Sequence, residues 1–398
     1  MVYSTPGFGE RKLVKKRKIA AIFGTRPDTI KMAPVILELR KEEKFFDVLN
    51  VATAQHREML DQVLEVFGIR PDYDLDVMQP RQTLAEITKN VIHALDQVLA
   101  KEQPDLVLVQ GDTTTTFVGS LAAFYRRIPV GHVEAGLRTH DKANPFPEEI
   151  NRRLTSIITD LHFAPTSTSR KALLRENVDP ASVYVTGNSV IDALKIAVRR
   201  DYSFTVPDLN DIVRGRRKII LITMHRRENW GNPMASAARA LRRIADIFPD
   251  LHLVFPVHLN PIVRDVVFPI LQSAPNVSLI RPLDYLDFVN IMAKSHLIIT
   301  DSGGVQEEGP SLGKPILVLR EVTERPEAVE YGTVKLVGLD EEKIVRTARR
   351  LLTDKRAYAR MASATNPYGD GRSARRIVQI IKHYFGMARY LPKEFIPR

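Results

Sequence analysis

Short apolar runs alternate with longer amphipathic stretches along almost the whole chain. A run that is apolar on both faces is typical of a strand buried in a parallel sheet, and a longer amphipathic stretch is typical of a helix packed on it. The predicted strands are residues 18–23, 48–53, 106–110, 130–134, 183–186, 218–223, 251–256, 297–300 and 316–319. Residues 29–41 and 83–101 are examples of the predicted helices. The repeated strand–helix order favours an α/β protein with doubly wound parallel sheets.

This order is interrupted once, over residues 199–217. The stretch is polar and contains Pro207 and Asn210, so we expect a linker region or a surface excursion near a domain boundary. A chain of 398 residues also exceeds the usual size of one hydrophobic core. We therefore expect two domains. Because open parallel sheets bind ligands at the carboxyl ends of their strands, we expect a site in the cleft between the two domains.

The composition is that of an ordinary globular protein, with 44% hydrophobic and 26% charged residues. No apolar run approaches the ~20 residues that a membrane-spanning helix needs, and the first 18 residues lack the apolar core of a secretory signal. We expect no association with a membrane. The sequence contains no cysteine, which excludes disulfides, thiolate nucleophiles and cysteine-bound zinc and fits a cytoplasmic location.

The net charge of +11 is concentrated at the two ends of the chain. Residues 1–18 contain six Lys/Arg and one Glu, residues 372–398 contain seven Lys/Arg and one Glu, and the residues between them are formally neutral. A nucleic-acid-binding protein normally carries its positive charge on a face or groove of the folded domain. Terminal basic segments are more often solvated tails. We therefore expect no nucleic-acid partner, and we expect residues 1–17 to be a disordered extension.

Three familiar motifs occur in the wrong context. Residues 369–374 match a dinucleotide-binding turn but follow Asn-Pro-Tyr instead of a strand. Residues 309–315 resemble a P-loop that is one residue short and has proline where the magnesium-binding hydroxyl belongs. His132 and Glu134 resemble part of the zinc deaminase motif, whose cysteine ligands the chain lacks. We expect neither a redox cofactor nor a metal.

Polar residues do follow several predicted strands, where open sheets bind ligands. After the first strand, Pro27 suits the first turn of a helix. Arg26 and Lys31 then place two cations near the N-terminus of that helix, which is a typical phosphate site. The alternative for Arg26 is an ion pair with a surface carboxylate.

Three carboxylates occupy comparable positions in the first half of the chain. Asp112 follows residues 106–110 and is either a helix N-cap or a catalytic carboxylate. Glu134 ends a predicted strand between small residues that leave room for a ligand. Glu148 follows a proline-rich loop and is either a functional carboxylate or a helix cap.

The second half supplies a histidine and a candidate phosphate site. His225 follows residues 218–223 beside two arginines, where it suits acid/base chemistry or hydrogen bonding to a diphosphate. After residues 297–300, a serine and two glycines would let a phosphate approach the backbone N–H groups of a helix N-terminus. Glu308 follows within that helix and is placed to hold ribose hydroxyls, and Arg325 adds positive charge after the next strand. The pattern predicts a nucleotide diphosphate held mainly by the second half, with its attached group facing the carboxylates of the first half.

Taken together and in this order, the motifs closely resemble those of the bacterial non-hydrolysing UDP-N-acetylglucosamine 2-epimerases. In the first half the resemblance is carried by FGTRP (23–27), KMAP (31–34), TAQHREMLDQVL (53–64), QGDTTTT (110–116), GHVEAGLRT (131–139) and PFPEE (145–149). In the second half it is carried by HRREN (225–229), PVHLNP (256–261), TDSGGVQEE (300–308), SLGKP (311–315), TERPE (323–327) and NPYGDG (366–371). It extends over roughly residues 18–384.

The resemblance implies a GT-B fold, in which two Rossmann-like domains with parallel sheets face an interdomain cleft. Residues 1–187 would form the first domain, residues 188–368 the UDP-binding domain, and residues 369–398 a C-terminal helix that packs back on the first domain. It also implies a homodimeric isomerase that converts UDP-N-acetylglucosamine reversibly to UDP-N-acetylmannosamine for cell-surface polysaccharide synthesis. The reaction would pass through anti elimination of UDP to 2-acetamidoglucal and re-addition of UDP, which inverts C2 without a redox cofactor.

The resemblance also assigns roles to single residues. The positions of the family's acid/base and elimination residues are Asp112, Glu134, Glu148 and His225. The positions that contact UDP are Arg26, Lys31, Phe288, Ser302, Gly303, Gly304, Glu308 and Arg325, with Phe288 beside the uracil. The positions that bind a second UDP-N-acetylglucosamine as an allosteric activator are Gln55, Arg81, Arg226 and His258. The chain departs from some regulated members at Glu58, where they carry glutamine.

Three rival functions share part of this pattern. A GT-B glycosyltransferase would use the same fold and a UDP-sugar but would need an acceptor pocket, which the sequence does not identify. A hydrolysing 2-epimerase would release UDP and free N-acetylmannosamine. A nucleic-acid-binding or scaffold protein would use the basic ends of the chain.

Overall fold

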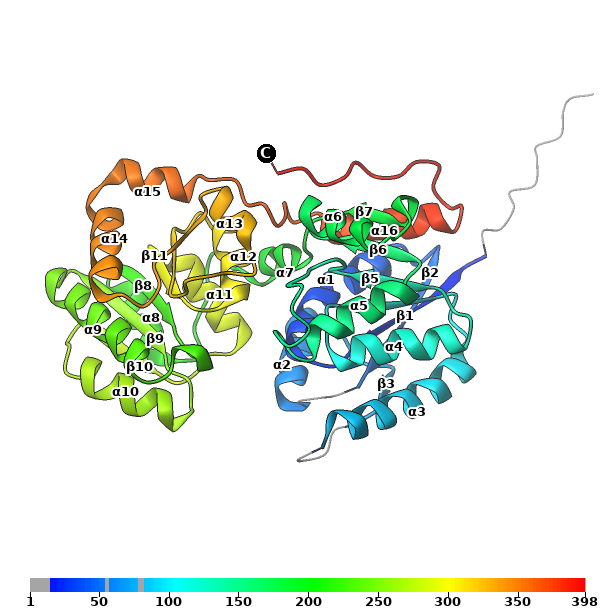
Figure 1. The fold of residues 1–398 in the computed structure, drawn as a ribbon, viewed down its shortest axis with the longest axis horizontal. Helices are drawn as coiled ribbons and strands as arrows, with labels where there is room; N and C mark the ends of the chain where they lie inside the picture. Colours follow the sequence, from blue (N-terminus) through cyan, green and yellow to red (C-terminus); the bar gives the residue numbers. More distant parts are fainter. Residues whose placement is uncertain (1–14, 54–56, 78–81, 398) are drawn as a thin grey trace, which may run out of the picture.

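The computed structural model describes residues 15–53, 57–77 and 82–397, and two parallel sheets dominate it. We call each sheet with its covering helices a lobe, and the two lobes lie side by side (Figure 1). The first lobe contains a seven-stranded sheet of order β3-β2-β1-β4-β5-β6-β7, and the second a six-stranded sheet of order β10-β9-β8-β11-β12-β13. This confirms the predicted α/β class, and two doubly wound sheets are the arrangement of a GT-B fold.

The first lobe has its strands at β1 (Arg17–Phe23), β2 (Phe46–Ala52), β3 (Tyr73–Asp74), β4 (Leu106–Gln110), β5 (Val130–Val133), β6 (Leu161–Ala164) and β7 (Val183–Val185). Its helices are α1 (Arg26–Lys41), α2 (Arg57–Phe67), α3 (Leu84–Glu102), α4 (Thr114–Tyr125), α5 (Glu148–Ile158) and α6 (Ser167–Arg175). Every strand pair in this sheet is parallel. The carboxyl ends of all its strands therefore lie along one edge.

The second lobe has its strands at β8 (Lys218–Thr223), β9 (Leu251–Pro256), β10 (Val277–Ile280), β11 (Leu297–Thr300), β12 (Ile316–Val318) and β13 (Val334–Leu336). Its helices are α8 (Pro207–Arg214), α9 (Asn232–Ile247), α10 (Pro261–Leu271), α11 (Tyr285–Lys294), α12 (Gly303–Ser311), α13 (Pro326–Glu330), α14 (Glu341–Thr353) and α15 (Lys355–Ala362). These strands are also paired in parallel throughout.

Two helices connect the lobes. Helix α7 (Val190–Ala197) lies between them and packs against α1 of the first lobe and against α11 and α12 of the second (Figure 1). After α15 the chain returns to the first lobe, where α16 (Ser373–Tyr384) packs on α1. Lys382 of α16 forms an ion pair of 3.0 Å with Glu42. Beyond α16 the chain is extended, and the backbone N–H of Phe395 donates to Val185 O at 2.9 Å.

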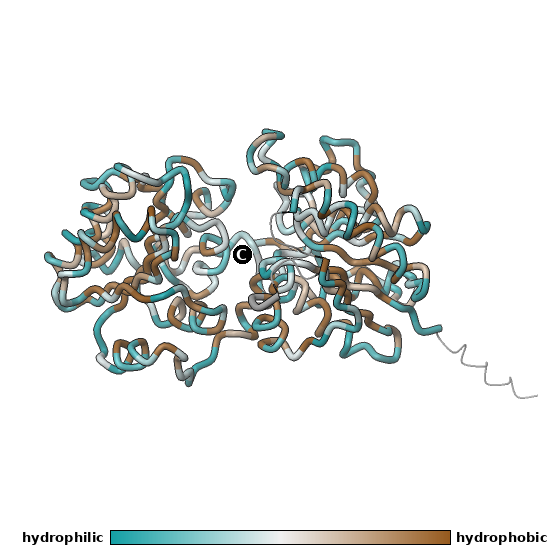
Figure 2. The backbone as a smooth tube through the Cα atoms, turned by 90° about the horizontal axis from the view of Figure 1, so that it is seen from below, coloured by the Kyte–Doolittle hydropathy of each residue, from teal (hydrophilic) through white to brown (hydrophobic). Residues whose placement is uncertain are grey.

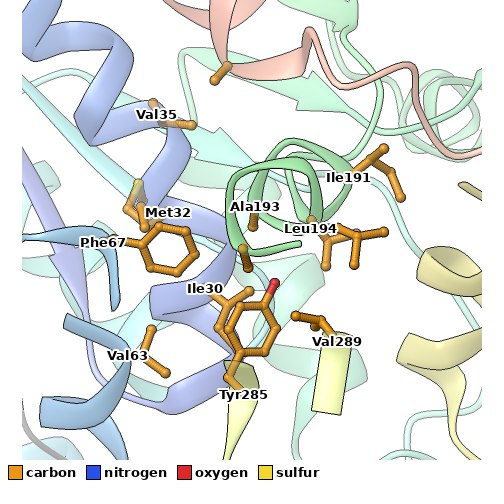
Figure 3. Close-up of a cluster of buried hydrophobic side chains, with 14 of the residues drawn as sticks. Ile30, Met32, Val35, Val63, Phe67, Ile191, Ala193, Leu194, Tyr285 and Val289 are labelled. Carbon is orange, nitrogen blue, oxygen red and sulfur yellow. The ribbon is translucent and has the colours of Figure 1, made fainter. Parts of the chain in front are cut away.

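Hydrophobic burial explains this arrangement. The most hydrophobic backbone segments run through the interior of each lobe, and hydrophilic segments lie mostly on the outside (Figure 2). A further apolar cluster joins the lobes, where Tyr285 and Val289 of α11 lie beside Ile30 of α1 and Phe67 of α2 (Figure 3). The rings of Tyr285 and Phe67 are 6.1 Å apart. Among the described residues, no helix combines the length and hydrophobicity needed to span a bilayer.

The structure corrects two expectations. Arg17 belongs to β1 rather than to the predicted extension, because its guanidinium pairs with Asp105 at 2.6 Å; residues 1–14 lie outside the described part. Residues 199–217 form no free linker, because they contain α8 and Leu209 is fully buried. Asp287 of α11 accepts hydrogen bonds from Tyr202 Oη at 2.9 Å and from the backbone N–H of Thr205 at 3.0 Å.

Shortening a buried side chain of α16 tests whether the C-terminal segment stabilises the first lobe. Ile381 is fully buried, and Ile381→Ala should lower the free energy of unfolding by about 2–5 kcal/mol because it leaves a cavity. Arg375, exposed on the same helix, is the matched control, and Arg375→Ala should change it by less than about 0.5 kcal/mol. Urea unfolding measures both values. Equal effects of the two changes would contradict a stabilising role for α16.

Candidate active site

A cavity of about 590 Å³ lies between the lobes and is the setting of the candidate site. The first lobe contributes the start of α1, and the second contributes the ends of β8 and β9 and the start of α12. Of the residues singled out in the sequence, those that line the cavity are Arg26, Lys31, His225, His258, Phe288, Ser302, Gly304, Glu308 and Arg325. The predicted ligand residues of both halves therefore meet in one cavity.

The N-terminus of α12 opens on this cavity and is suited to bind an anion. Ser302 is its N-cap residue, and its hydroxyl makes no capping bond to the helix. Gly303 lies against the guanidinium of Arg325, where a Cβ would stand only 3.2 Å from Arg325 Cζ. Free backbone N–H groups, a hydroxyl and a guanidinium thus converge at one point, which is a typical phosphate-binding arrangement.

Arg325 is held in place by carboxylates of its own lobe. Its Nε donates to Glu307 Oε1 at 2.8 Å, and its Nη1 donates to Glu324 Oε2 at 2.8 Å. Burial alone would lower the pKa of Arg325, but Glu307 and Glu324 outweigh it and raise the pKa above its usual value. The side chain is therefore a permanent, oriented cation in the cavity wall.

Lys31 of the first lobe is, like Arg325, a cation that lines the cavity and pairs with a buried carboxylate. Its Nζ donates to both carboxylate oxygens of Glu134, at 2.7 and 2.5 Å. Burial opposes the charge on both groups, yet the ion pair dominates: the pKa of Lys31 is raised and that of Glu134 is lowered. Lys31 lines the cavity, and its partner Glu134 lies directly behind it.

Glu134 sits in an unusual backbone conformation at the end of β5. Its φ is +66°, in the left-handed region that residues with a Cβ rarely adopt, and such strain is found mainly where the surrounding structure enforces it. Its Oε1 lies 3.9 Å from the position of a Cβ on Gly111, the residue that precedes Asp112. The turn after β4 and the end of β5 are thereby brought together.

Asp112 does not cap helix α4, which was one of the two roles that the sequence allowed for it. The cap of α4 is Thr113, whose hydroxyl accepts from the backbone N–H of Thr116 at 3.3 Å. The carboxylate of Asp112 instead accepts a hydrogen bond from Arg152 of α5. Arg152 of the first lobe and Arg325 of the second line a second, smaller pocket. Asp112 therefore reaches the contact between the lobes through its partner Arg152.

Glu148 is the first residue of α5, and Pro147 occupies the cap position without a side-chain bond. Within the described ranges no hydrogen bond or ion pair links Glu148 to the other candidate groups. A carboxylate in the first turn is favoured by the helix dipole. Glu148 lies one helical turn before Arg152, the side chain that bonds to Asp112, so α5 carries both Glu148 and the partner of Asp112.

His225 is positioned by Asp301 at the end of β11. Asp301 is completely buried, and its Oδ2 accepts from the backbone N–H groups of His225 and Arg226, at 2.8 Å each. Its Oδ1 lies 3.3 Å from His225 Nδ1. The ring of His258 stacks on that of His225, with centroids 6.1 Å apart. This arrangement leaves the His225 ring facing the cavity, where it can donate to an anion.

Arg26 of α1 and Glu308 of α12 also line the cavity. Arg26 makes no hydrogen bond or salt bridge within the described part of the chain, so the surface ion pair considered above is absent there. Burial lowers the pKa of Arg26, with Asp284 opposing the shift. Burial and the neighbouring Glu307 raise the pKa of Glu308 to about 8. A polar ligand would give the Arg26 guanidinium and the Glu308 carboxyl the hydrogen-bonding partners that both lack in the described part of the cavity wall.

The four predicted activator residues are only partly described. His258 lines the cavity beside His225, and Arg226 follows His225 in the same loop and lies 3.7 Å from Glu324. Gln55 and Arg81 lie outside the described residues, as does the side chain of Glu58.

Four structurally important residues were not identified in the sequence: Asn188, Glu307, Asp301 and Arg152. Asp301 and Glu307 belong to the same motif as Ser302 and Glu308, and this position directly beside predicted residues is a signal that could have found them. Asn188 and Arg152 acquire their roles only through contacts with residues 40 or more positions away, at Glu134 and Asp112. No local pattern carries that information.

The chain is similar to known proteins along most of its length. The chain matches the family model described as UDP-N-acetylglucosamine 2-epimerase over residues 38–382. It is 55% identical to the UDP-N-acetylglucosamine 2-epimerase of Bacillus subtilis over 382 residues, which cover 96% of this chain and 99% of that protein.

Two solved structures with ligands are similar to this chain. One is UDP-GlcNAc 2-epimerase from Neisseria meningitidis bound to UDP-GlcNAc, with 50% identity, a TM-score of 0.83 and coverage of 92% of this chain and 100% of that one. The other is the enzyme from Methanocaldococcus jannaschii in complex with UDP-GlcNAc and UDP, with 35% identity, a TM-score of 0.75 and coverage of 92% and 99%. With a family model that spans most of its length and relatives identical at half of their positions, the chain belongs to the UDP-N-acetylglucosamine 2-epimerase family.

Proposed function

We propose that this chain interconverts UDP-N-acetylglucosamine and UDP-N-acetylmannosamine by the non-hydrolysing route. The observation that carries the proposal is the two-sided cavity. The second lobe offers the N-terminus of α12 and Arg325 to a diphosphate, and the first lobe offers Lys31 with the buried carboxylate of Glu134 behind it. UDP-GlcNAc is the ligand in the solved relative from Neisseria meningitidis.

In the proposed reaction, a carboxylate of the first lobe removes the proton from C2 while the bond between C1 and the UDP oxygen breaks. The electron pair of the C–H bond forms the C1–C2 double bond of 2-acetamidoglucal, and UDP leaves with the electrons of the C–O bond. UDP then adds back to C1, and a proton is returned to the opposite face of C2. Asp112, Glu134 and Glu148 are the proposed proton carriers, and His225 with the cavity cations stabilises the departing diphosphate.

The proposal divides the UDP contacts between the lobes. Arg26 and Lys31 contact UDP from α1. Ser302, Gly303, Gly304 and Arg325 bind the diphosphate, Glu308 the ribose hydroxyls and Phe288 the uracil. No metal or redox cofactor takes part in this scheme. Residues 1–187 act as the first domain, 188–368 as the UDP-binding domain and 369–398 as the C-terminal return segment.

A homodimer and a cytoplasmic location are part of the same proposal. Helices α4 and α5 pack together and expose Phe124, Tyr125, Leu154 and Ile157, of which Ile157 is 80% exposed. Large contiguous apolar patches mark interaction sites, and a homodimer interface over α4 and α5 would bury these four side chains. A sequence without cysteine fits the reducing cytoplasm.

The proposal also includes an activator site for a second UDP-N-acetylglucosamine. Its support is the position of Arg226 and His258 beside His225.

Incubation with UDP-N-acetylglucosamine in D2O tests the proposed function. The expected product is UDP-N-acetylmannosamine that carries deuterium at C2, detected by NMR and mass spectrometry. Recovery of the substrate with no deuterium would contradict the proposal. Release of UDP with free N-acetylmannosamine would indicate the hydrolysing reaction, and transfer of the sugar to an added acceptor would indicate a glycosyltransferase.

Asp112→Asn and Glu134→Gln should each lower kcat by about 10²- to 10⁴-fold, because each removes a group that exchanges a proton with C2. UDP affinity, measured by calorimetry, should not weaken in either variant, because neither carboxylate is among the proposed UDP contacts. Glu43→Gln is the control for a carboxylate in the same lobe, since Glu43 is exposed. A variant that keeps the full rate would remove that residue from the proton transfer.

The UDP affinity should rise with pH up to about pH 8. Glu308, with its pKa raised to about 8, is mostly protonated at pH 6, and ribose hydroxyls bind the ionised carboxylate better. The dissociation constant should therefore fall between pH 6 and 8, by at most about tenfold per unit, and level off above pH 8. Glu308→Gln removes this component and leaves the titration of UDP itself. Parallel pH profiles of the two proteins would contradict the proposed contact.

A further inference from the structure

Asn188 links the two lobes through one side-chain amide. It lies between β7 and α7 and is 2% exposed. Its Nδ2 donates to Glu134 Oε2 of the first lobe at 2.7 Å and to Glu307 Oε2 of the second lobe at 3.0 Å. The two carboxylates belong to β5's end and to α12, which are 173 positions apart in sequence numbering, so the contact exists only in the folded protein.

The orientation of this amide is determined by its other end. The Oδ1 of Asn188 accepts from the backbone N–H of Val190 at 3.1 Å. Because only the amide oxygen can accept that bond, the NH2 group must face the two carboxylates. The backbone is held as well: Asn188 N donates to Tyr368 O at 2.6 Å, and Ser189 Oγ donates to Lys31 O at 2.7 Å. The donor is thus presented from a rigid turn.

An amide is the side chain that this position requires. Glu134 and Glu307 are both buried, and each already has one cation, Lys31 or Arg325. The NH2 group adds one donor to each carboxylate without adding charge. A carboxylate at position 188 would put a third negative group beside the first two, and an apolar side chain would leave both with a lost hydrogen bond.

Ligand binding would change the two ion pairs but not the amide contacts. Lys31 and Arg325 line the cavity, so a diphosphate would compete with Glu134 and Glu307 for them. Asn188, Glu134 and Glu307 do not line it. Once Lys31 turns toward the ligand, the contact from Asn188 is the one that continues to orient the carboxylate of Glu134.

We propose that Asn188 is a positioning residue that holds Glu134 in the orientation needed for proton transfer and ties it to Glu307 on the diphosphate-binding helix. The inference rests on the proposed function, because it assigns Asn188 a part in the same reaction. The charged groups that face Glu134 from the elements packed around it are Lys31, Arg325 and Glu307, with His132 on its own strand.

Asn188→Ala tests this assignment. We expect kcat to fall by about 10- to 100-fold, because a small misplacement of a reacting group has that effect, while UDP affinity stays within about threefold. The limb of the pH–rate profile that Glu134→Gln abolishes should move to higher pH, because loss of a donor to the ionised carboxylate raises its pKa. Asn188→Ala added to Glu134→Gln should cause no further loss of rate, as expected for two residues that act as a unit.

Asn276→Ala is the matched control. Asn276 is also buried, but its Nδ2 donates to the backbone oxygens of Ala245 and Phe248 and not to a carboxylate. It should lower stability without moving the pH profile. If Asn188→Ala does not fold, Asn188→Ser serves instead, since its hydroxyl can still accept from Val190 but cannot bridge two carboxylates.

The outcomes separate the inference from the proposed function. Absence of conversion by the unmodified protein would contradict the function itself. An active unmodified protein, together with an Asn188 variant whose kcat and pH profile match those of Asn276→Ala, would overturn the role of Asn188 alone. Additive losses in the double variant with Glu134→Gln would overturn it as well.

Discussion

Two carboxylates, Glu134 from the first lobe and Glu307 from the second, are buried where the lobes meet. An unpaired buried charge costs several kcal/mol, so each requires a partner at a defined place. Lys31 and Arg325 supply the cations, and Asn188 bridges the two pairs. This continuous chain of contacts constrains how the end of β5 lies relative to α12, and the cavity between the lobes depends on that placement.

The same chain explains why the cavity suits a nucleotide diphosphate. Both cations belong to the cavity wall, while the carboxylates that neutralise them lie behind it. An incoming anion can therefore take over the cations from their partners, and the N-terminus of α12 adds backbone donors at the same point. The strained backbone of Glu134, with φ at +66°, is consistent with a residue placed for chemistry at some expense of stability.

Much of the fold could be predicted from the sequence, because buried parallel strands have an apolar signature. The ends of β4, β8, β9 and β11 agree with the predicted ones. The strands β3, β6, β10 and β13 were not predicted, because β3, β10 and β13 are only partly buried and β6 has a histidine among its apolar residues. Residues 199–217 looked like a linker because they are polar. Their bonds to Asp287, from the Tyr202 hydroxyl and the Thr205 backbone N–H, hold them on α11, and local sequence cannot reveal these contacts.

The candidate site was predictable in its parts but not in its connections. Glycines and cations after strands indicated the cavity residues. Whether Asp112 caps α4 depended on its neighbour Thr113, which satisfies the same backbone N–H more directly. The bridging role of Asn188 follows from contacts between segments that are distant in the sequence, so no local sequence pattern predicts it.

A crystal structure of the complex with UDP tests the central claim most directly. The account predicts diphosphate oxygens within hydrogen-bonding distance of the α12 N-terminus and the Arg325 guanidinium, with Lys31 turned toward the ligand and Asn188 still bonded to Glu134 and Glu307. A diphosphate bound elsewhere in the cleft, with the N-terminus of α12 empty and the ion pair between Lys31 and Glu134 unchanged, would contradict it.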